Sequence, residues 1–308
     1  MERDERAESV SFYFWKTSYK LSNFETDYLK QRHIKKIYLR CFDVVPEKNI
    51  PTPKGVLIWN DTLLNNMAYI PTVFIRNEIF LNTDTTAMKL LADKVVSLCT
   101  QIFAARKLSI SEIQIDCDWT KNTRDSYFCF LTYLKRKKLI VSNTLRLYQY
   151  KYRNESGIAP TDYASLMCYN MGNMKDEMAA NSILNKKDLT SYLGSQSAYP
   201  KPINIALPIF NWTLLYSQHS FKGILYTNPD LKNNHWKRIS DVQYLCIQNY
   251  YDLNCEQEFY KDEEIRIEKI SKHELNEAIL TIKQHVKNSK NEIIYFDLDS
   301  TKIRNCLY

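Results

Sequence analysis

Two aspartates, Asp116 and Asp118, stand one residue apart in the stretch 111–138, "SEIQIDCDWTKNTRDSYFCFLTYLKRKK". Polar and apolar residues alternate over 112–119, which predicts a strand, and the second half predicts a helix. Alternate side chains of a strand point to the same side, about 7 Å apart. Two carboxylates at that separation, partly shielded from water, perturb each other's pKa values. The pair is therefore a candidate for acid–base chemistry or for binding hydroxyl groups.

The rest of the chain alternates short apolar runs with helical patterns, of which 84–108 is the longest. This order predicts a parallel sheet with crossover helices, and eight such units in about 300 residues fit a (β/α)8 TIM barrel. The competing fold is an open doubly wound sheet, which usually brings a glycine-rich first turn. The chain has 5 glycines and no GxGxxG pattern. The eight expected strands are 10–17, 36–45, 68–80, 112–119, 144–152, 160–171, 202–210 and 292–300.

We expect one barrel domain over residues 10–308. The irregular segment 211–270 is expected to be an insertion between the seventh strand and its helix. The charged start, 1–9, is expected to be disordered. Without a signal-peptide pattern, a cytoplasmic location is the default, but an exported or lipid-anchored protein with a trimmed leader stays open.

Several expected strands end in polar or aromatic residues. In a barrel those ends converge on one mouth, where active sites lie. The set contains carboxylates, amides, Tyr and Trp, and lacks a Cys–His or Ser–His–Asp arrangement. Such groups suit a polyhydroxylated ligand, since amides and carboxylates bond hydroxyls while aromatic faces pack on C–H surfaces. The alternative for 112–119 is an edge strand with its polar side in solvent.

Composition argues against other classes of function. The formal charge is +7, but its densest run, 135–138, is typical of the exposed end of a helix, so no nucleic-acid partner is expected. The 8 cysteines show no CxxC spacing, so we expect no structural zinc. Asp116 and Asp118 fit no known metal-binding loop, and no metal or cofactor is expected. No apolar run is long enough for a membrane span.

The stretch "IDCDWT" resembles the strand-four signature DxxDxDxE of family-18 glycoside hydrolases, the chitinase-like barrels. Asp116 and Asp118 match its second and third acids, and Trp119 matches a frequent aromatic. The first acid of the signature corresponds to Ile113 in this chain. The family's proton-donating Glu falls at Thr120, whose hydroxyl is far too weak an acid to replace it near neutral pH.

Two further stretches carry the same resemblance. "LMCYNM" is similar to the family's strand-six pattern through Met167, Tyr169 and Asn170. "ALPIFNW" (205–212 region) is similar to the strand-seven pattern of a small residue, Leu, Pro and an aromatic. In this family the acid before the Glu, here Asp118, orients the acetamide of the substrate. The resemblance thus implies a TIM barrel with a glycan site.

The sequence leaves open whether a glycan is cleaved and which group would donate the proton. If cleavage occurs, another carboxylate must donate the proton, with Glu78, Asp43, Asp297 and Asp299 as candidates. We assign catalytic roles to Asp118, Asp116 and Glu78. The first hypothesis is a glycoside hydrolase, the second a non-catalytic, lectin-like glycan-binding barrel, and the third an unrelated barrel enzyme. The expected ligand-binding residues are Trp119, Thr120, Gln149, Met167, Tyr169, Asn170, Asn211, Trp212 and Asp297.

Overall fold

The computed structural model describes residues 9–308 except 178, 180, 195–196 and 288. Eight parallel strands close into a barrel, because β1 pairs with β18 on one side and with β3 on the other. This closure confirms the predicted TIM barrel and excludes the open sheet. Around the barrel the strands are β1 (Ser9–Phe14), β3 (Lys36–Glu47), β6 (Ala68–Ile75), β7 (Glu112–Asp116), β8 (Ile140–Arg146), β9 (Tyr163–Met167), β10 (Ile203–Pro208) and β18 (Ser289–Phe296).

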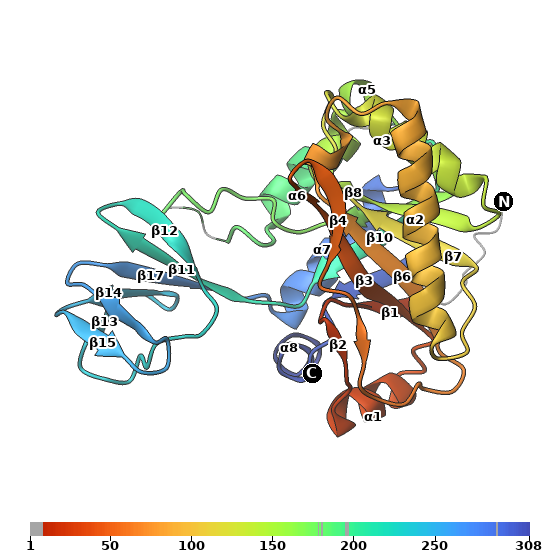
Figure 1. Ribbon diagram of the computed structural model, residues 1–308. Helices are drawn as coiled ribbons and strands as arrows, with labels where there is room; N and C mark the ends of the chain where they lie inside the picture. The colour runs from red at the N-terminus through yellow and green to blue at the C-terminus, as the bar shows by residue number, and fades with distance from the viewer. Residues whose placement is uncertain (1–8, 178, 180, 195–196, 288) are drawn as a thin grey trace.

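Helices cover the outside of the barrel, with the long α2 lying across one flank (Figure 1). Ser22 and Ser271 begin α1 and α7 with capping boxes, in which Glu25 and Glu274 return the hydrogen bond. The helices are α1 (Asn23–Gln31), α2 (Thr85–Ala104), α3 (Arg124–Lys135), α4 (Leu147–Lys151), α5 (Arg153–Ser156), α6 (Lys186–Leu193), α7 (Lys272–His285) and α8 (Ser300–Leu307), with a 3-10 turn at η1 (Asn77–Phe80).

Strand β7 divides its side chains as its alternating sequence predicts. Ile113, Ile115 and Cys117 are buried in the apolar layer beneath the helices. Gln114 points into the barrel, where its amide donates to the Ser165 hydroxyl at 3.1 Å. The same parity carries Asp116 toward the C-terminal mouth of the barrel.

The fifth strand differs from its prediction. The alternating pattern 144–152 predicts a strand, but β8 ends at Arg146 and residues 147–151 form α4. The buried Gln149 side chain accepts from the backbone N–H of Arg146 at 2.9 Å, which stabilises a helical turn directly after the strand. The apolar start of β8, at Ile140 and Val141, lies four residues before the expected strand.

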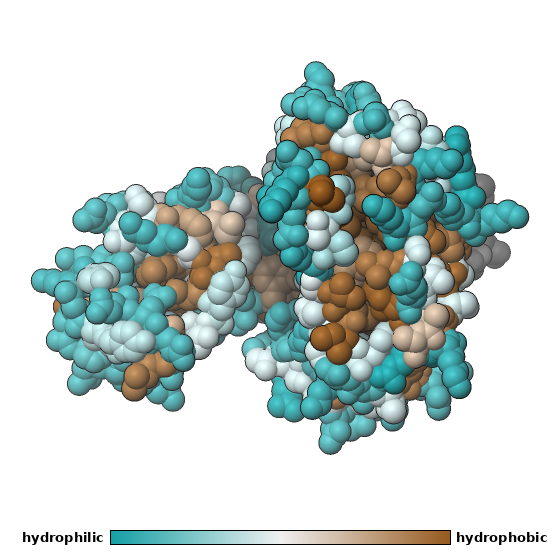
Figure 2. All heavy atoms as spheres, in the orientation of Figure 1, coloured by the Kyte–Doolittle hydropathy of each residue, from teal (hydrophilic) through white to brown (hydrophobic). Residues whose placement is uncertain are grey.

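The expected irregular segment 211–270 is an ordered antiparallel unit that projects from the barrel as a separate lobe (Figures 1 and 2). Its own core contains Trp236, Cys246, Phe259 and Ile265. One five-stranded sheet comprises β12 (Ser220–Leu225), β11 (Trp212–Ser217), β17 (Glu264–Glu268), β14 (Gln243–Cys246) and β13 (Trp236–Arg238), and a hairpin comprises β15 (Tyr250–Asp252) and β16 (Gln257–Phe259).

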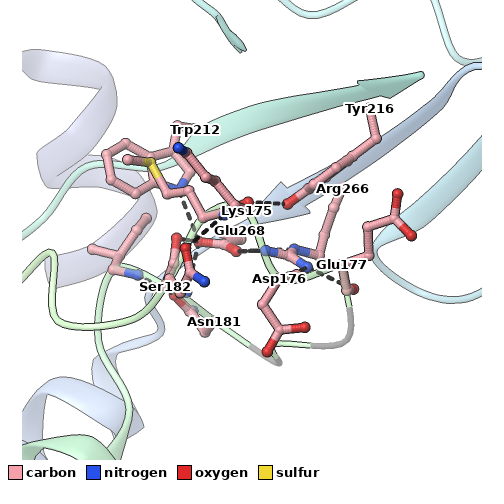
Figure 3. Close-up of polar contacts among 12 residues, drawn as sticks. Lys175, Asp176, Glu177, Asn181, Ser182, Trp212, Tyr216, Arg266 and Glu268 are labelled. Atoms are coloured by element: carbon pink, nitrogen blue, oxygen red, sulfur yellow. Dashed lines mark hydrogen bonds and ion pairs between the residues drawn. The ribbon is translucent and has the colours of Figure 1, made fainter. Parts of the chain in front are cut away.

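A buried polar cluster ties this lobe to the barrel (Figure 3). Arg266 Nη2 pairs with Glu268 Oε1 at 2.8 Å, and both side chains are almost fully buried. Arg266 Nη1 donates to the carbonyls of Asp176 and Glu177, at 2.8 and 2.7 Å. Glu268 Oε2 accepts from the Ser182 hydroxyl at 2.6 Å. The inserted sheet therefore holds the loop between β9 and α6.

Small pairings complete the fold: β4 (Ile50–Lys54) forms a hairpin with β3, and β2 (Ser18–Tyr19) pairs with β5 (Ile58–Trp59). Of the terminal segment 1–9, residues 1–8 lie outside the described residues, and Ser9 is the first residue of β1. Within the described part of the chain, no helix has the length and apolar character that crossing a membrane requires.

Candidate functional site

A pocket of about 260 Å³ opens among the C-terminal ends of the barrel strands. Parallel strands deliver their last residues to the same end of a barrel, so residues far apart in sequence meet there. Five of the predicted site residues lie on its wall, namely Asp116, Asp118, Met167, Tyr169 and Asn170. The remaining wall residues are Trp15, Phe74, Arg146, Leu147, Tyr148, Met171, Tyr192, Phe210 and Phe296.

Asp116 is the last residue of β7, and it is largely enclosed by its neighbours. Its Oδ1 accepts a 2.7 Å hydrogen bond from the Thr144 hydroxyl on β8. Burial raises the pKa of the Asp116 carboxyl to about 7, although the hydrogen bond from Thr144 opposes the shift. The negative charges of Asp118 and Asp43 raise the pKa further, and Arg146 lowers it. Asp116 thus changes its protonation state near neutral pH.

Asp118 lies beyond the end of β7, with half of its side chain exposed. Its Oδ2 is 3.4 Å from Arg146 Nη1, at the end of β8. Both groups line the pocket, so the wall carries an ion pair whose members remain open to a ligand. The guanidinium has five N–H donors, and a single partner leaves most of them available for hydroxyl or carboxylate groups.

Aromatic rings form another part of the wall. Tyr169 and Phe296 are stacked, with ring centroids 5.7 Å apart, and Phe210 stands edge-on to both rings. Trp15, which follows β1, contacts Phe296 at 5.6 Å between centroids. Phe74, on β6, completes this part of the wall. Such rings present flat apolar faces beside the polar groups of Asp118 and Arg146.

Asn170 takes a backbone conformation suited to its residue type. Its φ of 52° lies in the left-handed region, which asparagine tolerates better than most residues. Its N–H donates to the Ile183 carbonyl at 2.8 Å, so the turn after β9 is tied to the loop before α6. This turn places Tyr169, Asn170 and Met171 together on the pocket wall.

Trp119 and Thr120 do not lie on the pocket wall. Trp119 is buried, stacks on Tyr127 of α3 at 5.2 Å, and donates from Nε1 to the Ser156 carbonyl at 2.9 Å. Trp119 has the same parity as Ile113 and Ile115, whose side chains point outward from the barrel, so it packs beneath the helices. Thr120 lies next to the start of α3, where its N–H donates to the Thr123 hydroxyl at 2.9 Å.

Three more predicted ligand residues lie off the pocket wall, and two of them make other contacts. The buried Gln149 donates from Nε2 to the Trp119 carbonyl at 2.9 Å, so it braces the chain after β7. Trp212 contacts Phe210 but directs its Nε1 to Glu268 at 2.7 Å, in the cluster of Figure 3. Asn211 is exposed and is not among the residues that line the pocket.

The other carboxylates proposed as proton donors are held in ion pairs away from the pocket wall. Glu78 Oε1 lies 2.6 Å from Arg76 Nη2 on the turn η1, and this arginine lowers the pKa of Glu78. Asp297 is buried and pairs with Lys302 of α8. The lowered pKa makes Glu78 a poorer proton donor. In the described part of the chain, the pocket wall therefore carries only the carboxylates Asp116 and Asp118.

Apart from Tyr169, the aromatic wall residues were missed by the sequence reasoning, although a signal exists for some of them. Trp15, Phe74 and Phe296 stand at or just after the ends of three apolar strands. Phe74 shares the parity of Thr72 on β6, so the rule used for β7 would have selected it, whereas in the last strand the polar Asp297 and Asp299 pointed to the parity opposite to that of Phe296. Tyr192 of α6 carries no such signal, because the path of the β9–α6 loop decides its position.

Among the described residues, no group of three or more His, Cys, Asp and Glu side chains is arranged to hold a metal ion. Asp116 and Asp118 alone supply two carboxylates, and Arg146 already pairs with one of them. The pocket therefore offers hydrogen-bonding groups and aromatic faces.

The chain thus forms an eight-stranded barrel with its acids at and just after the end of the fourth strand and an inserted sheet after the seventh, a fold that it shares with chitinases. Comparison with solved structures identifies this fold. A spore cortex-lytic enzyme SleL from Bacillus megaterium superimposes with a TM-score of 0.54 and 15% identity, over 99% of this chain and 75% of that one.

Two further structures show the same fold. A chitinase from Chromobacterium violaceum has a TM-score of 0.50 and 11% identity, over 98% of this chain and 99% of the other. Human YKL-39, described as a pseudo-chitinase with retained chitooligosaccharide binding, has a TM-score of 0.51 and 7% identity, over 98% and 96%. No protein-family model and no curated protein sequence matches the chain.

Proposed function

We propose that the protein binds an oligosaccharide at the C-terminal mouth of its barrel and does not cleave it. The supporting observation is the composition of the pocket wall, which combines aromatic residues with Asp118, Arg146 and Asn170. Rings stack on the C–H faces of sugars while the polar groups bond their hydroxyl and amide substituents. One neighbour in fold, human YKL-39, keeps chitooligosaccharide binding as a pseudo-chitinase.

We infer the lack of cleavage from the number and positions of the carboxyl groups at the pocket. Acid-catalysed glycoside hydrolysis uses one carboxyl group to protonate the leaving oxygen and a second group on the other side of the bond. Here both pocket carboxylates come from the end of one strand, β7, and the resemblance to family-18 hydrolases implies that Thr120 replaces the proton donor. Glu78 and Asp297 are engaged by Arg76 and Lys302.

Hydrolysis is a second candidate, and one observation favours it. Burial raises the pKa of Asp116 to about 7, a value at which a carboxylic acid can donate a proton near neutral pH. In that case Asp116 would be the acid and Asp118 the group that orients the substrate.

The test is calorimetric titration with oligomers of β-1,4-linked N-acetylglucosamine and with soluble peptidoglycan fragments. Tyr169→Phe removes one hydroxyl from the pocket and keeps its ring, and we expect it to weaken binding by about tenfold, the effect of one lost hydrogen bond. Tyr251→Phe is the matched control, because Tyr251 is exposed on β15, in the hairpin of the inserted lobe.

Chromatography of the same oligomers after prolonged incubation separates the two candidates. Binding without shorter products supports the binding protein. Products that disappear in Asp116→Asn would support the hydrolase instead. Lack of binding to all of these glycans would contradict both.

A further inference from the structure

Three tyrosines and one lysine form a continuous surface beside the pocket, which we call the tyrosine shelf: Tyr148, Lys151 and Tyr152 at α4, and Tyr192 on α6. The rings of Tyr148 and Tyr152 are 4.8 Å apart between centroids. Lys151 Nζ lies 5.5 Å from the ring centroids of both Tyr152 and Tyr192. The lysine thus joins the two helices and holds their rings together by cation–π contacts.

The shelf is exposed and continuous with the pocket. Tyr148 and Tyr192 line the pocket wall, whereas Tyr152 lies beyond it. The exposed fractions of Tyr148 and Tyr152 are 54% and 40%. Rings that are already fixed by their neighbours lose little conformational entropy when a ligand packs on them.

The size of the pocket requires such an extension for an oligosaccharide. Its volume of about 260 Å³ lies below the range of roughly 300–1,000 Å³ typical of sites for drug-sized ligands. A ligand of several sugar units must therefore continue over the rim.

Other parts of the rim differ in chemistry from the shelf. In the middle of the long strand β3, Arg40 and Asp43 form a charged pair with a 2.7 Å contact. At the end of β6, Arg76 and Glu78 form another, at 2.6 Å. Within each pair the two side chains satisfy each other's charge, and neither pair offers a flat apolar face. The tyrosine rings of α4 and α6 do offer such a face.

We propose that the tyrosine shelf is a second sugar subsite. One end of the oligosaccharide occupies the pocket, and the shelf binds a further sugar unit of the same molecule. Tyr152, whose ring lies outside the pocket, contacts that further unit. The ligand class is thus an extended glycan of at least two units, which leaves the pocket across α4 and α6. The inference rests on the proposed function of the pocket.

The experiment compares ligand lengths. The dimer and the hexamer of β-1,4-linked N-acetylglucosamine are titrated against the wild type, Tyr152→Ala and Tyr152→Phe. We expect the wild type to bind the hexamer more tightly than the dimer. Tyr152→Ala should lose about 3- to 10-fold in hexamer affinity, the range for one aromatic contact, and keep its dimer affinity. Tyr152→Phe should keep both, since it retains the ring.

Tyr226→Ala is the matched control, because this tyrosine is 97% exposed on the inserted lobe. Thermal unfolding of each variant shows that the fold is intact. Unchanged hexamer affinity in Tyr152→Ala would overturn the subsite and leave the proposed glycan pocket standing. Equal losses for dimer and hexamer would also overturn it, because Tyr152 would then act on the pocket itself. A wild type that binds neither length would overturn the pocket and the subsite together.

Discussion

The Thr144 hydroxyl donates a 2.7 Å hydrogen bond to Asp116 Oδ1, across the neighbouring strands β8 and β7. This bond favours the charged carboxylate, yet burial outweighs it and the pKa of Asp116 is raised to about 7. Burial, and not this bond, therefore decides the charge of Asp116 on the pocket wall. It also makes the stability of the protein depend on pH in a direction opposite to that of most carboxylates.

The first prediction concerns this dependence. Between the ordinary pKa of 3.8 and the raised value of about 7, the folded protein holds a proton that the unfolded chain releases. The contribution of Asp116 to the free energy of unfolding therefore falls as pH rises through this window. Asp116→Asn should gain stability relative to the wild type from pH 4.5 to pH 8, on the order of 2–4 kcal/mol, measured by urea unfolding.

Asp125→Asn serves as the control for this series, because the Asp125 carboxylate on α3 is 84% exposed. Its difference from the wild type should stay constant over the same pH range. A constant difference for Asp116→Asn as well would contradict the raised pKa.

The second prediction concerns the ion pair of Asp118 and Arg146. Each side chain is half exposed, and such a pair contributes at most about 1 kcal/mol to stability. Arg146→Gln should therefore leave the unfolding midpoint nearly unchanged while weakening glycan binding, because the guanidinium lines the pocket. Calorimetric titration and thermal unfolding give the two readouts. A large loss of stability with unchanged affinity would show that Arg146 has a structural role instead.

The third prediction separates two tryptophans. Trp119 is buried on the helix side of β7 and donates to the Ser156 carbonyl, whereas Trp15 lines the pocket. Trp119→Phe should lower the free energy of unfolding by about 1–3 kcal/mol and leave glycan affinity unchanged. Trp15→Phe should weaken glycan binding and leave the free energy of unfolding nearly unchanged. If Trp119→Phe weakened binding without loss of stability, the ligand role expected from the family resemblance would be supported after all.

The fourth prediction concerns the buried pair that holds the inserted lobe (Figure 3). Arg266→Met leaves the Glu268 carboxylate buried without its cation, which should cost about 3–5 kcal/mol in urea unfolding. Arg266→Met combined with Glu268→Leu removes both charges and should cost less than Arg266→Met alone. The exposed pair Arg238–Asp241, on the same lobe, provides the control, and Arg238→Met should cost at most about 1 kcal/mol. Equal costs for Arg266→Met and Arg238→Met would contradict a structural role for the buried pair.

The sequence by itself determined the alternation of strands and helices in the barrel, apart from the bounds of the fifth strand, and the two faces of β7. Ile113 and Ile115 lie outside the barrel, and Gln114 and Asp116 lie inside or at its mouth, as alternation requires. These features follow from local periodicity, because a strand sends successive side chains to opposite sides whatever its partners are. Closure of the barrel then brought Met167, Tyr169 and Asn170 beside Asp116 and Asp118.

Only the tertiary structure decided which other residues share that pocket. Glu78, Gln149 and Asp297 are polar residues near strand ends, but each is satisfied by a neighbour that the fold supplies. The path of the β9–α6 loop, held by Arg266 of the distant inserted sheet, fixes the turn that carries Tyr169 and leads to Tyr192. Contacts between distant segments depend on the packing of the whole barrel, and they also set the burial that raises the pKa of Asp116.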